Sequence, residues 1–265
     1  MRRFAGLAAG LLVATACATP GSVWSPLPPG DPRPGVLLAA WVEGAEQRQG
    51  LRGRARLAVD GGDGEVRLRG RQLVALERPG RLRVEVQGLL SQTLAVLVTD
   101  GTRYELFRAD DRSYRSGPVY PGLLWEQTHL DLTPEEIIEL LLGMPAPDPT
   151  LVPSAALIDA DSTVRLDLAD AEGRVRRRAH FDAGGLLRRV EVLDAEGEWL
   201  WTAGFDDYAP VDGVDFAHAV TLDVAAGGTR AEITLKDVQL NPALSPDIFR
   251  LRAPQPPAAA AKPGG

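Results

Sequence analysis

The sequence predicts a mainly β protein with helices, built as an unclosed antiparallel β-barrel, that is, one strongly curved sheet. Two blocks of residues, about 50–101 and 160–240, alternate apolar and polar side chains with a period of two. This period is typical of antiparallel strands with one dry and one wet face. Apolar helical patterns stand before and between the blocks. We expect these helices to cover the concave apolar face of the sheet.

The strand pattern is clearest in RLRVEV (81–86), where leucine and valine alternate with arginine and glutamate. The same alternation occurs in EVRLRGRQLVAL (65–76), and it returns in TVRLDL (163–168) and FAHAVTLDV (216–224). Successive strand residues point to opposite faces of a sheet, so each segment predicts one face toward a core and one toward water. Turn residues between the runs, such as Pro79-Gly80, predict short connections between neighbouring strands.

The first predicted helix spans 36–49, with the sequence VLLAAWVEGAEQRQ. Leu37, Leu38 and Trp41 share one helical face, and the segment becomes polar toward its end. This pattern is typical of an amphipathic helix that packs one face against a core.

The second predicted helix has both a start and a stop in the sequence. Thr133 can cap the helix, and Pro134 is suited to its first position. Glu136 completes a capping box with Thr133, and Gly143 ends the helix. Between them, IIELLL (137–142) is apolar almost all round. Such a helix is either buried or covers an apolar surface.

The amino-terminal residues have the layout of a secretory signal. Arg2 and Arg3 form a short basic region, and 7–13 is an apolar stretch too short to be a comfortable membrane span. Cys17 is the only cysteine of the chain. The string VATAC, which ends at Cys17, resembles the bacterial lipobox, whose cysteine is lipidated and becomes the first residue of the mature protein. We therefore expect a signal peptide over 1–16 and lipidation of Cys17.

An ordinary signal peptide, cleaved near Ala16 with Cys17 incidental, is the alternative. The resemblance to the lipobox implies instead an anchor of more than one acyl chain, which holds a protein stably in a bilayer. Ala18 follows the cysteine at the position where Asp retains enterobacterial lipoproteins at the inner membrane. The resemblance therefore implies a lipid-anchored protein of the outer membrane, on its periplasmic face.

The composition on either side of the repetitive strand blocks predicts unfolded segments. Residues 17–35 are expected to be the lipidated cysteine and an extended tether, because 18–35 contains six prolines. The last segment, 253–265, reads APQPPAAAAKPGG and is typical of a disordered tail. The folded domain is therefore expected over 36–252.

The charge of the chain excludes one class of partner. The net charge is −7, and loss of residues 1–16 removes only Arg2 and Arg3 from the charged set, which makes the mature chain more acidic at −9. Binding to nucleic acid requires clustered lysine and arginine to neutralise phosphates. An acidic chain without a basic stripe therefore predicts no nucleic-acid partner.

The sequence nominates no catalytic or metal site. His129, His180 and His218 lie far apart and outside any metal-ligand spacing. The chain also has no nucleophile elbow and no phosphate-binding loop. His218 is expected to be a hydrogen-bonded core histidine, and His180 to be solvated on a polar face. We predict that the protein is not an enzyme and uses no metal or cofactor; an active site assembled from scattered carboxylates is the alternative.

A pair of leucines stands in the expected hairpin connection of VQGLLSQTLAVLVTDG (86–101). Leu89 and Leu90 are flanked there by Gly88 and Ser91. The pair can either fold inward and cap the core, or project from the loop. The sequence pattern alone leaves these two alternatives open.

The order of features resembles the LolA/LolB-like superfamily, and most closely the family of outer-membrane lipoprotein receptors that sort lipoproteins. The resemblance covers roughly 36–252. The segments that carry it are a lipobox and a helix, followed by GRARL, PGRLRVEV, GLLSQTLAVL, LLLGMP, EGEW and the closing LNPALSPDIFRLRAP.

This resemblance implies an unclosed barrel whose apolar concavity shelters acyl chains under covering helices. It also implies that Leu89 matches a leucine on a protruding loop that assists membrane insertion, with Leu90 beside it in place of the family's glycine. In the helix, Ile137, Leu140 and Leu141 are then expected to line or cover the groove; Leu140 replaces the family's tryptophan.

The resemblance therefore implies an outer-membrane lipoprotein that binds the acyl chains of lipoproteins, or another lipid cargo, and delivers them to the membrane. Its expected partners are the cargo, a periplasmic carrier protein that hands the cargo over, and the outer membrane. The alternative function is that of a non-catalytic structural or interaction lipoprotein of an envelope complex, which would have the same fold with a filled core.

Overall fold

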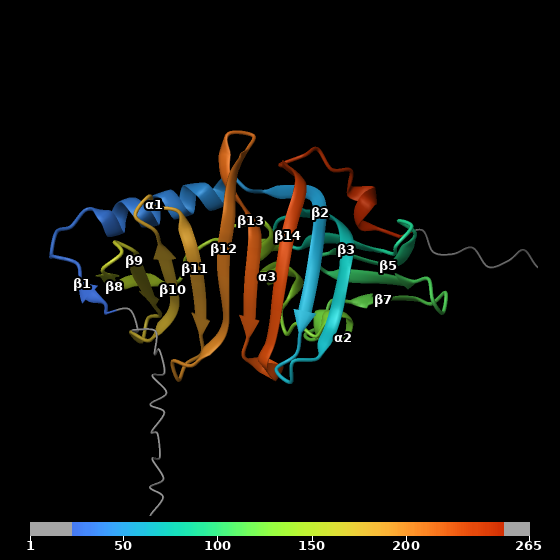
Figure 1. Cartoon of the computed structure of the whole chain (residues 1–265), viewed down its shortest axis with the longest axis horizontal. Helices are drawn as coiled ribbons and strands as arrows, with labels where there is room; N and C mark the ends of the chain where they lie inside the picture. Colours follow the sequence, from blue (N-terminus) through green and yellow to red (C-terminus); the bar gives the residue numbers. More distant parts are fainter. Residues whose placement is uncertain (1–22, 252–265) are drawn as a thin grey trace, which may run out of the picture.

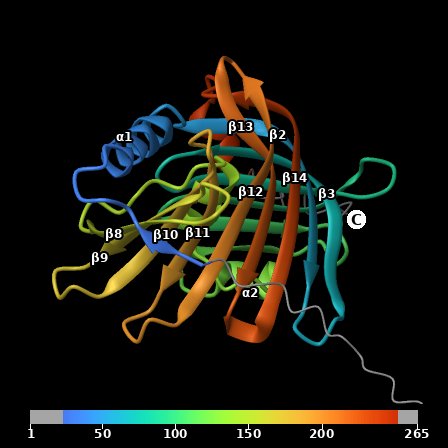
Figure 2. The same cartoon turned by 60° about the vertical axis from the view of Figure 1, so that its left-hand side comes forward.

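The strands form a single open antiparallel sheet. The computed structural model describes residues 23–251, with 14 strands in the order β1-β8-β9-β10-β11-β12-β13-β14-β2-β3-β4-β5-β6-β7. The end strands β1 and β7 do not pair with each other, so the sheet curls without closing (Figure 1, Figure 2). The predicted fold class is confirmed. The expected signal peptide (1–16), Cys17 and the expected tail (253–265) lie outside the described residues.

The strands form two meanders, which contain the two predicted blocks (50–101 and 160–240) and extend beyond each of them. The first contains β2 (Gly50–Asp60), β3 (Val66–Glu77), β4 (Arg81–Gln87), β5 (Thr93–Asp100), β6 (Arg103–Arg108) and β7 (Tyr114–Pro118). The second contains β8 (Val152–Ile158), β9 (Val164–Ala169), β10 (Val175–Phe181), β11 (Leu187–Leu193), β12 (Trp199–Val211), β13 (Val214–Val224) and β14 (Thr229–Leu240). The last strand, β14, pairs with β2 and so joins the two meanders into one sheet.

Short elements complete the described part of the chain. The helices are α1 (Arg33–Glu46), α2 (Leu123–Thr128) and α3 (Pro134–Leu141), and 3-10 turns occur at Ala226–Gly228 and Pro246–Phe249. In Figure 1, α1 follows the upper rim of the sheet, while α2 and α3 lie behind its strands. The helices α2 and α3 thus lie on the inner side of the curl, as the sequence predicts, whereas α1 packs along its rim.

The fold begins before the predicted boundary at residue 36. Ser25–Pro26 forms β1, which pairs with β8, and α1 begins at Arg33. The ring of Trp24 lies edge-on to His180, with the ring centroids 5.5 Å apart. The expected tether (17–35) is therefore structured over its later part, because Trp24 and its neighbours gain apolar contacts and a proline is tolerated in an edge strand.

The start and end signals of the second predicted helix are confirmed. The side chain of Thr133 accepts a hydrogen bond from the backbone of Glu136, and the Glu136 carboxylate accepts one from the backbone of Thr133. Gly143 has a φ of 71°, the left-handed conformation that terminates helices. These two signals therefore fix where α3 begins and ends.

The carboxyl-terminal segment covers part of the outer face of the sheet. Val96 and Val98 point away from the concave face yet are buried, and the 3-10 turn Pro246–Phe249 packs beside β4 and β5. Arg83 donates a hydrogen bond of 3.0 Å to the carbonyl of Ile248, and Phe249 is buried. Both faces of the sheet are therefore buried at β4 and β5, because the carboxyl-terminal segment covers the outer face there.

One histidine differs from its expected environment. His180 lies on the outer face of β10 as predicted, but it is not solvated, because Trp24 covers it and its Nε2 atom lies 3.2 Å from the Glu191 carboxylate. His218 agrees with the expectation: its ring stacks edge-on against Phe216, and its Nδ1 atom lies 3.1 Å from the carbonyl oxygen of Leu235.

The ionised carboxylate of Glu191 is expected to stabilise the fold, and acid should remove this stabilisation. The side-chain contact with His180, helped by Arg189, lowers the pKa of Glu191 from 4.5 to about 2. A carboxylate whose pKa is lower in the folded state stabilises the fold above its unfolded pKa, and this stabilisation is lost as the pH falls through the folded pKa. We expect Glu191→Gln to reduce the free energy of unfolding by on the order of 2 kcal/mol at pH 7.

Denaturant unfolding of both proteins between pH 7 and pH 2 measures this contribution. The difference between wild type and Glu191→Gln is expected to shrink as the pH falls below about 4.5, toward zero near about 2. Glu198→Gln, on an exposed turn nearby, is the control and should change little. A difference that stays constant over this range contradicts the assignment.

Candidate functional site

The concave side of the first meander contains an apolar cavity of about 580 Å³. Its floor is formed by β2 to β6 with one residue of β14, and its cover by α2, α3 and the segment between them. The apolar lining side chains are Ala55, Leu57, Leu68, Val74, Leu82, Val84, Val86, Leu94, Ala95, Leu97, Leu106, Ala109, Leu124, Leu130, Ile137, Leu141 and Ile233. The volume and the apolar lining are those of sites that hold small apolar ligands.

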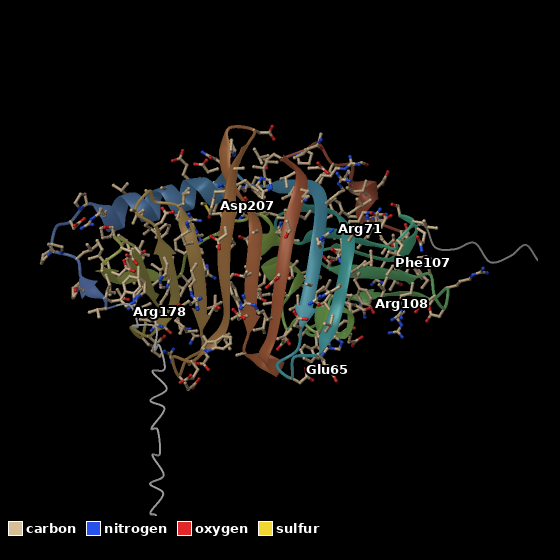
Figure 3. The ribbon with its side chains drawn as sticks, in the orientation of Figure 1. Glu65, Arg71, Phe107, Arg108, Arg178 and Asp207 are labelled. Carbon is tan, nitrogen blue, oxygen red and sulfur yellow. The ribbon has the colours of Figure 1, made fainter. Side chains whose placement is uncertain are left out.

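The cavity is polar at one end. Gln92, Arg108, Asp110 and Gln127 line it together with the apolar residues. Arg108 and Asp110 form an exposed ion pair with a nitrogen–oxygen distance of 2.7 Å, and the side-chain hydrogen bond from Arg108 lowers the pKa of Asp110 to about 2. Arg108 lies at the end of β6, on the right of the molecule in Figure 3. This end of the cavity therefore opens to solvent between charged and amide groups.

The helix α2 forms part of the cover, and the sequence patterns did not predict it. Leu123 and Leu124 are buried against Leu97 and Leu106, in a cluster separate from the main core. Gly122, with a φ of 85°, turns the chain into the helix. Six residues are too few to show a helical period, so the adjacent leucines after a Pro-Gly pair were the available signal.

Two of the three residues expected on the covering helix line the cavity. Ile137 and Leu141 are four positions apart, so they lie on one face of α3, and both border the cavity. Leu140 differs: it is 0 % exposed, belongs to the main core and does not line the cavity. Leu140 therefore does not line the groove, because α3 is buried on the side that Leu140 occupies.

The leucine pair projects from the loop between β4 and β5. Leu89 is 90 % exposed and Leu90 is 89 % exposed, so the alternative in which they fold inward is wrong. The loop is held by local bonds: the backbone of Leu90 donates to the Gln92 side chain (2.9 Å), and Arg71 donates to the carbonyl of Leu89 (3.4 Å). Figure 3 shows Arg71 on the same half of the sheet as Arg108.

The loop that carries the exposed leucines continues directly into residues that line the cavity. Immediately after Leu90 and Ser91, the residues Gln92, Thr93 and Leu94 line the cavity. The loop therefore stands at an edge of the cavity, and a ligand leaving past this edge passes beside two exposed apolar side chains.

Two further features were sought among residues 23–251, a cluster of metal-binding side chains and a helix able to cross a bilayer. These residues contain no group of three or more His, Cys, Asp or Glu residues placed to hold a metal ion. None of their helices has the length and apolar composition of a membrane span. Cys17, the expected lipidation site, lies outside this part of the chain.

Solved structures show the same architecture at low sequence identity. A DUF1329 family protein from Desulfovibrio piger superimposes with a TM-score of 0.60 at 13% identity, over 82% of this chain and 96% of that one. A LolA superfamily protein from Nitrosomonas europaea superimposes with a TM-score of 0.52 at 11% identity, over 81% of this chain and 97% of that one. No protein-family model and no curated protein matches the sequence. The chain therefore has a LolA/LolB-like fold.

Proposed function

We propose that this protein binds acyl chains in the cavity under α2 and α3 and delivers them to a membrane, without covalent chemistry. The observation that carries this proposal is an apolar cavity of about 580 Å³ directly beside a loop with two exposed leucines. The cargo is the acylated end of a lipoprotein, or another lipid. We further propose that Cys17 anchors the protein in the outer membrane, on the periplasmic face, where a soluble carrier protein hands over the cargo.

Apolar burial supplies the driving force for both steps. Each methylene group moved from water into the cavity contributes about 0.8 kcal/mol. The polar end of the cavity, with Arg108, Asp110 and Gln92, leaves the head of the cargo in solvent. Transfer onward is favourable if the bilayer binds the chain more strongly than the cavity does.

The alternative function, a structural module with a filled core, is not favoured by the geometry. That function needs side chains to occupy the concave face, whereas the structure leaves a cavity large enough for a ligand between Val84 and Leu141. A protein that only presents its outer surface to partners gains nothing from this cavity, and each unfilled volume in a core lowers stability.

A photo-crosslinking residue at Leu141 tests acyl binding directly. We expect the purified, lipid-extracted protein to capture a radiolabelled fatty acid when Leu141 carries the crosslinker, because Leu141 lines the cavity. The same crosslinker at exposed Arg69, on the outer face of β3, should capture little. Adding Val84→Trp to the Leu141 variant should abolish capture by filling the cavity, while thermal unfolding checks the fold. Equal capture at Leu141 and Arg69, or capture that Val84→Trp leaves unchanged, overturns the proposal.

A further inference from the structure

A buried amide in the wall of the cavity has no hydrogen-bond partner. Gln72 is 3 % exposed, and its side chain lines the cavity among aliphatic residues. Neither its Nε2 nor its Oε1 atom forms a hydrogen bond with any group of the described residues. A buried amide without partners is costly, and native proteins rarely retain one without a reason. A leucine would occupy almost the same volume at this position without that cost.

The register of the sheet places Gln72 where the cavity changes from apolar to polar. Across the strands β2 to β6, direct neighbours form one row: Ala55, Gln72, Val86, Ala95 and Arg108. All five line the cavity. Arg108, at the far end of the row, belongs to the solvent-exposed end. The amide and the charged end of the cavity are therefore level with each other on the sheet.

An open space at Gly70, the notch, adjoins the Gln72 amide. Gly70 is two residues before Gln72 and on the same face of β3. A Cβ atom added at Gly70 would lie 3.5 Å from Gln72 Nε2 and 4.0 Å from Val86 Cγ1, with no other atom within 4 Å. The absence of a side chain at Gly70 thus leaves open space in contact with the amide nitrogen.

We propose that Gln72 binds the linkage of an amide-linked acyl chain, so that the cavity selects a chain joined through an amide over one joined through an ester. This inference rests on the proposed function, because it requires an acyl chain in the cavity. The chain lies against the apolar residues, and its amide enters the notch beside Gly70 at the level of Gln72.

The chemistry of the two linkages explains the choice. The Gln72 side chain offers two N–H donors at Nε2 and an acceptor at Oε1. An ester linkage has acceptors only, so it leaves Oε1 unsatisfied after the ligand has excluded water. A trans amide has an N–H that can donate to Oε1, which no ester can do. An amide-linked chain is carried by any protein or lipid acylated on an amino group.

The test compares three uncharged ligands of equal chain length: N-methyllauramide, methyl laurate and methyl β-hydroxylaurate. Displacement of bound cis-parinaric acid measures the affinity of each ligand for the full-length chain with Cys17→Ser, which carries no acyl anchor, in detergent-free buffer. In the wild type we expect N-methyllauramide to bind about tenfold more tightly than methyl laurate. In Gln72→Leu we expect the affinity for the amide to fall about tenfold, while that for methyl laurate is unchanged or higher.

Two further variants separate a ligand contact from a structural effect. Gly70→Ala places a methyl group in the notch and should reduce the preference for the amide while Gln72 stays intact. Gln87→Leu makes the same chemical change at the end of β4, at a half-buried residue that does not line the cavity, and should preserve the preference. Gln72→Leu should also unfold at a higher temperature than the ligand-free wild type, since it removes an unsatisfied amide.

The outcomes distinguish this inference from the proposed function. If none of the ligands displaces the probe and the probe itself fails to bind, the proposed function fails. If the wild type binds all ligands but does not prefer the amide, or prefers the β-hydroxy ester to it, the role of Gln72 is wrong and the proposed function stands. A lower unfolding temperature for Gln72→Leu also overturns the inference, because it shows that the amide is already satisfied within the fold.

Discussion

Replacing both Leu89 and Leu90 by glutamate is expected to stop acyl transfer to membranes and to leave folding and acyl binding intact. The two side chains are about 90 % exposed, so they contribute almost no burial to the core. Inserted into a bilayer, each leucine would gain about 1.5–3 kcal/mol. Loss of this gain for both residues predicts a reduction in transfer rate of at least about a hundredfold.

The measurement is the transfer of a fluorescent fatty acid from the loaded protein to vesicles that contain a quenching lipid. Exposed apolar residues elsewhere on the sheet provide the matched control: Val66→Glu with Val152→Glu adds the same charge, at positions 55% and 58% exposed, away from the loop. This control should transfer at the wild-type rate. A comparable loss of rate in the control would mean that added negative charge, rather than the loop, limits transfer.

Alanine at both loop positions separates the loss of apolar surface from the effect of the added charge. We expect Leu89→Ala with Leu90→Ala to retain an intermediate rate, because a methyl group keeps only part of the apolar surface. A midpoint of thermal unfolding well below that of the wild type, in either double variant, would contradict the exposed position of the leucines. Unchanged transfer in the glutamate variant would remove the loop from the mechanism.

Many of the strands were predictable because the alternation of apolar and polar residues along a strand shows which of its faces is buried. In β4, the alternation of Leu82 and Val84 with charged residues follows directly from the pleat of a strand beside a core. The order of strands was not predictable in this way. The pairing of β14 with β2 depends on contacts between residues more than 170 positions apart, such as Ile233 and Leu57, and no local pattern records such a contact.

The candidate site was predictable where it follows a helical period. Ile137 and Leu141 are four residues apart on a strongly apolar helix, which is enough to place them together on the concave side. The third member, Leu140, shows the limit of the argument. A helix that is apolar almost all round does not tell which side faces a cavity and which faces a core, and the surrounding fold decides between them.

The site residues that the sequence did not indicate are those whose role depends on what lies opposite them. Gln72 shares the apolar face of its strand with Leu68 and Val74, but only the register with Ala55 and Val86 places it in the cavity wall. Trp24 likewise stands in a proline-rich segment with the composition of a linker. It contacts Arg165 in β9 and His180 in β10, both far along the chain. Because of these contacts the fold begins earlier in the sequence than the predicted boundary at residue 36.

Removal of the Trp41 side chain is expected to cause the largest loss of stability of any change in the helices. Trp41 is 1 % exposed, and its ring lies edge-on to Phe181, with centroids 5.9 Å apart. Its indole nitrogen donates a hydrogen bond of 2.7 Å to the carbonyl of Pro145. The residue therefore ties α1 both to β10 and to the segment that follows α3, the helix that covers the cavity.

Trp41→Ala is expected to reduce the free energy of unfolding by about 3–5 kcal/mol, because it leaves a large cavity in the core. For a domain of this size the midpoint of thermal unfolding should fall by on the order of 10 °C.

Trp41→Phe separates the two roles of the side chain: it retains most of the apolar contact but leaves the Pro145 carbonyl without its donor, at a cost of about 1–3 kcal/mol. Trp199→Ala, at a ring that is 42% exposed, makes the same change on the surface and should cost far less. If Trp41→Ala and Trp199→Ala destabilise the protein equally, α1 does not depend on this anchor. Trp41→Ala should also weaken fatty-acid binding at temperatures where the variant remains folded. That result would show that α1 helps to hold α3 over the cavity through the hydrogen bond from Trp41 to Pro145.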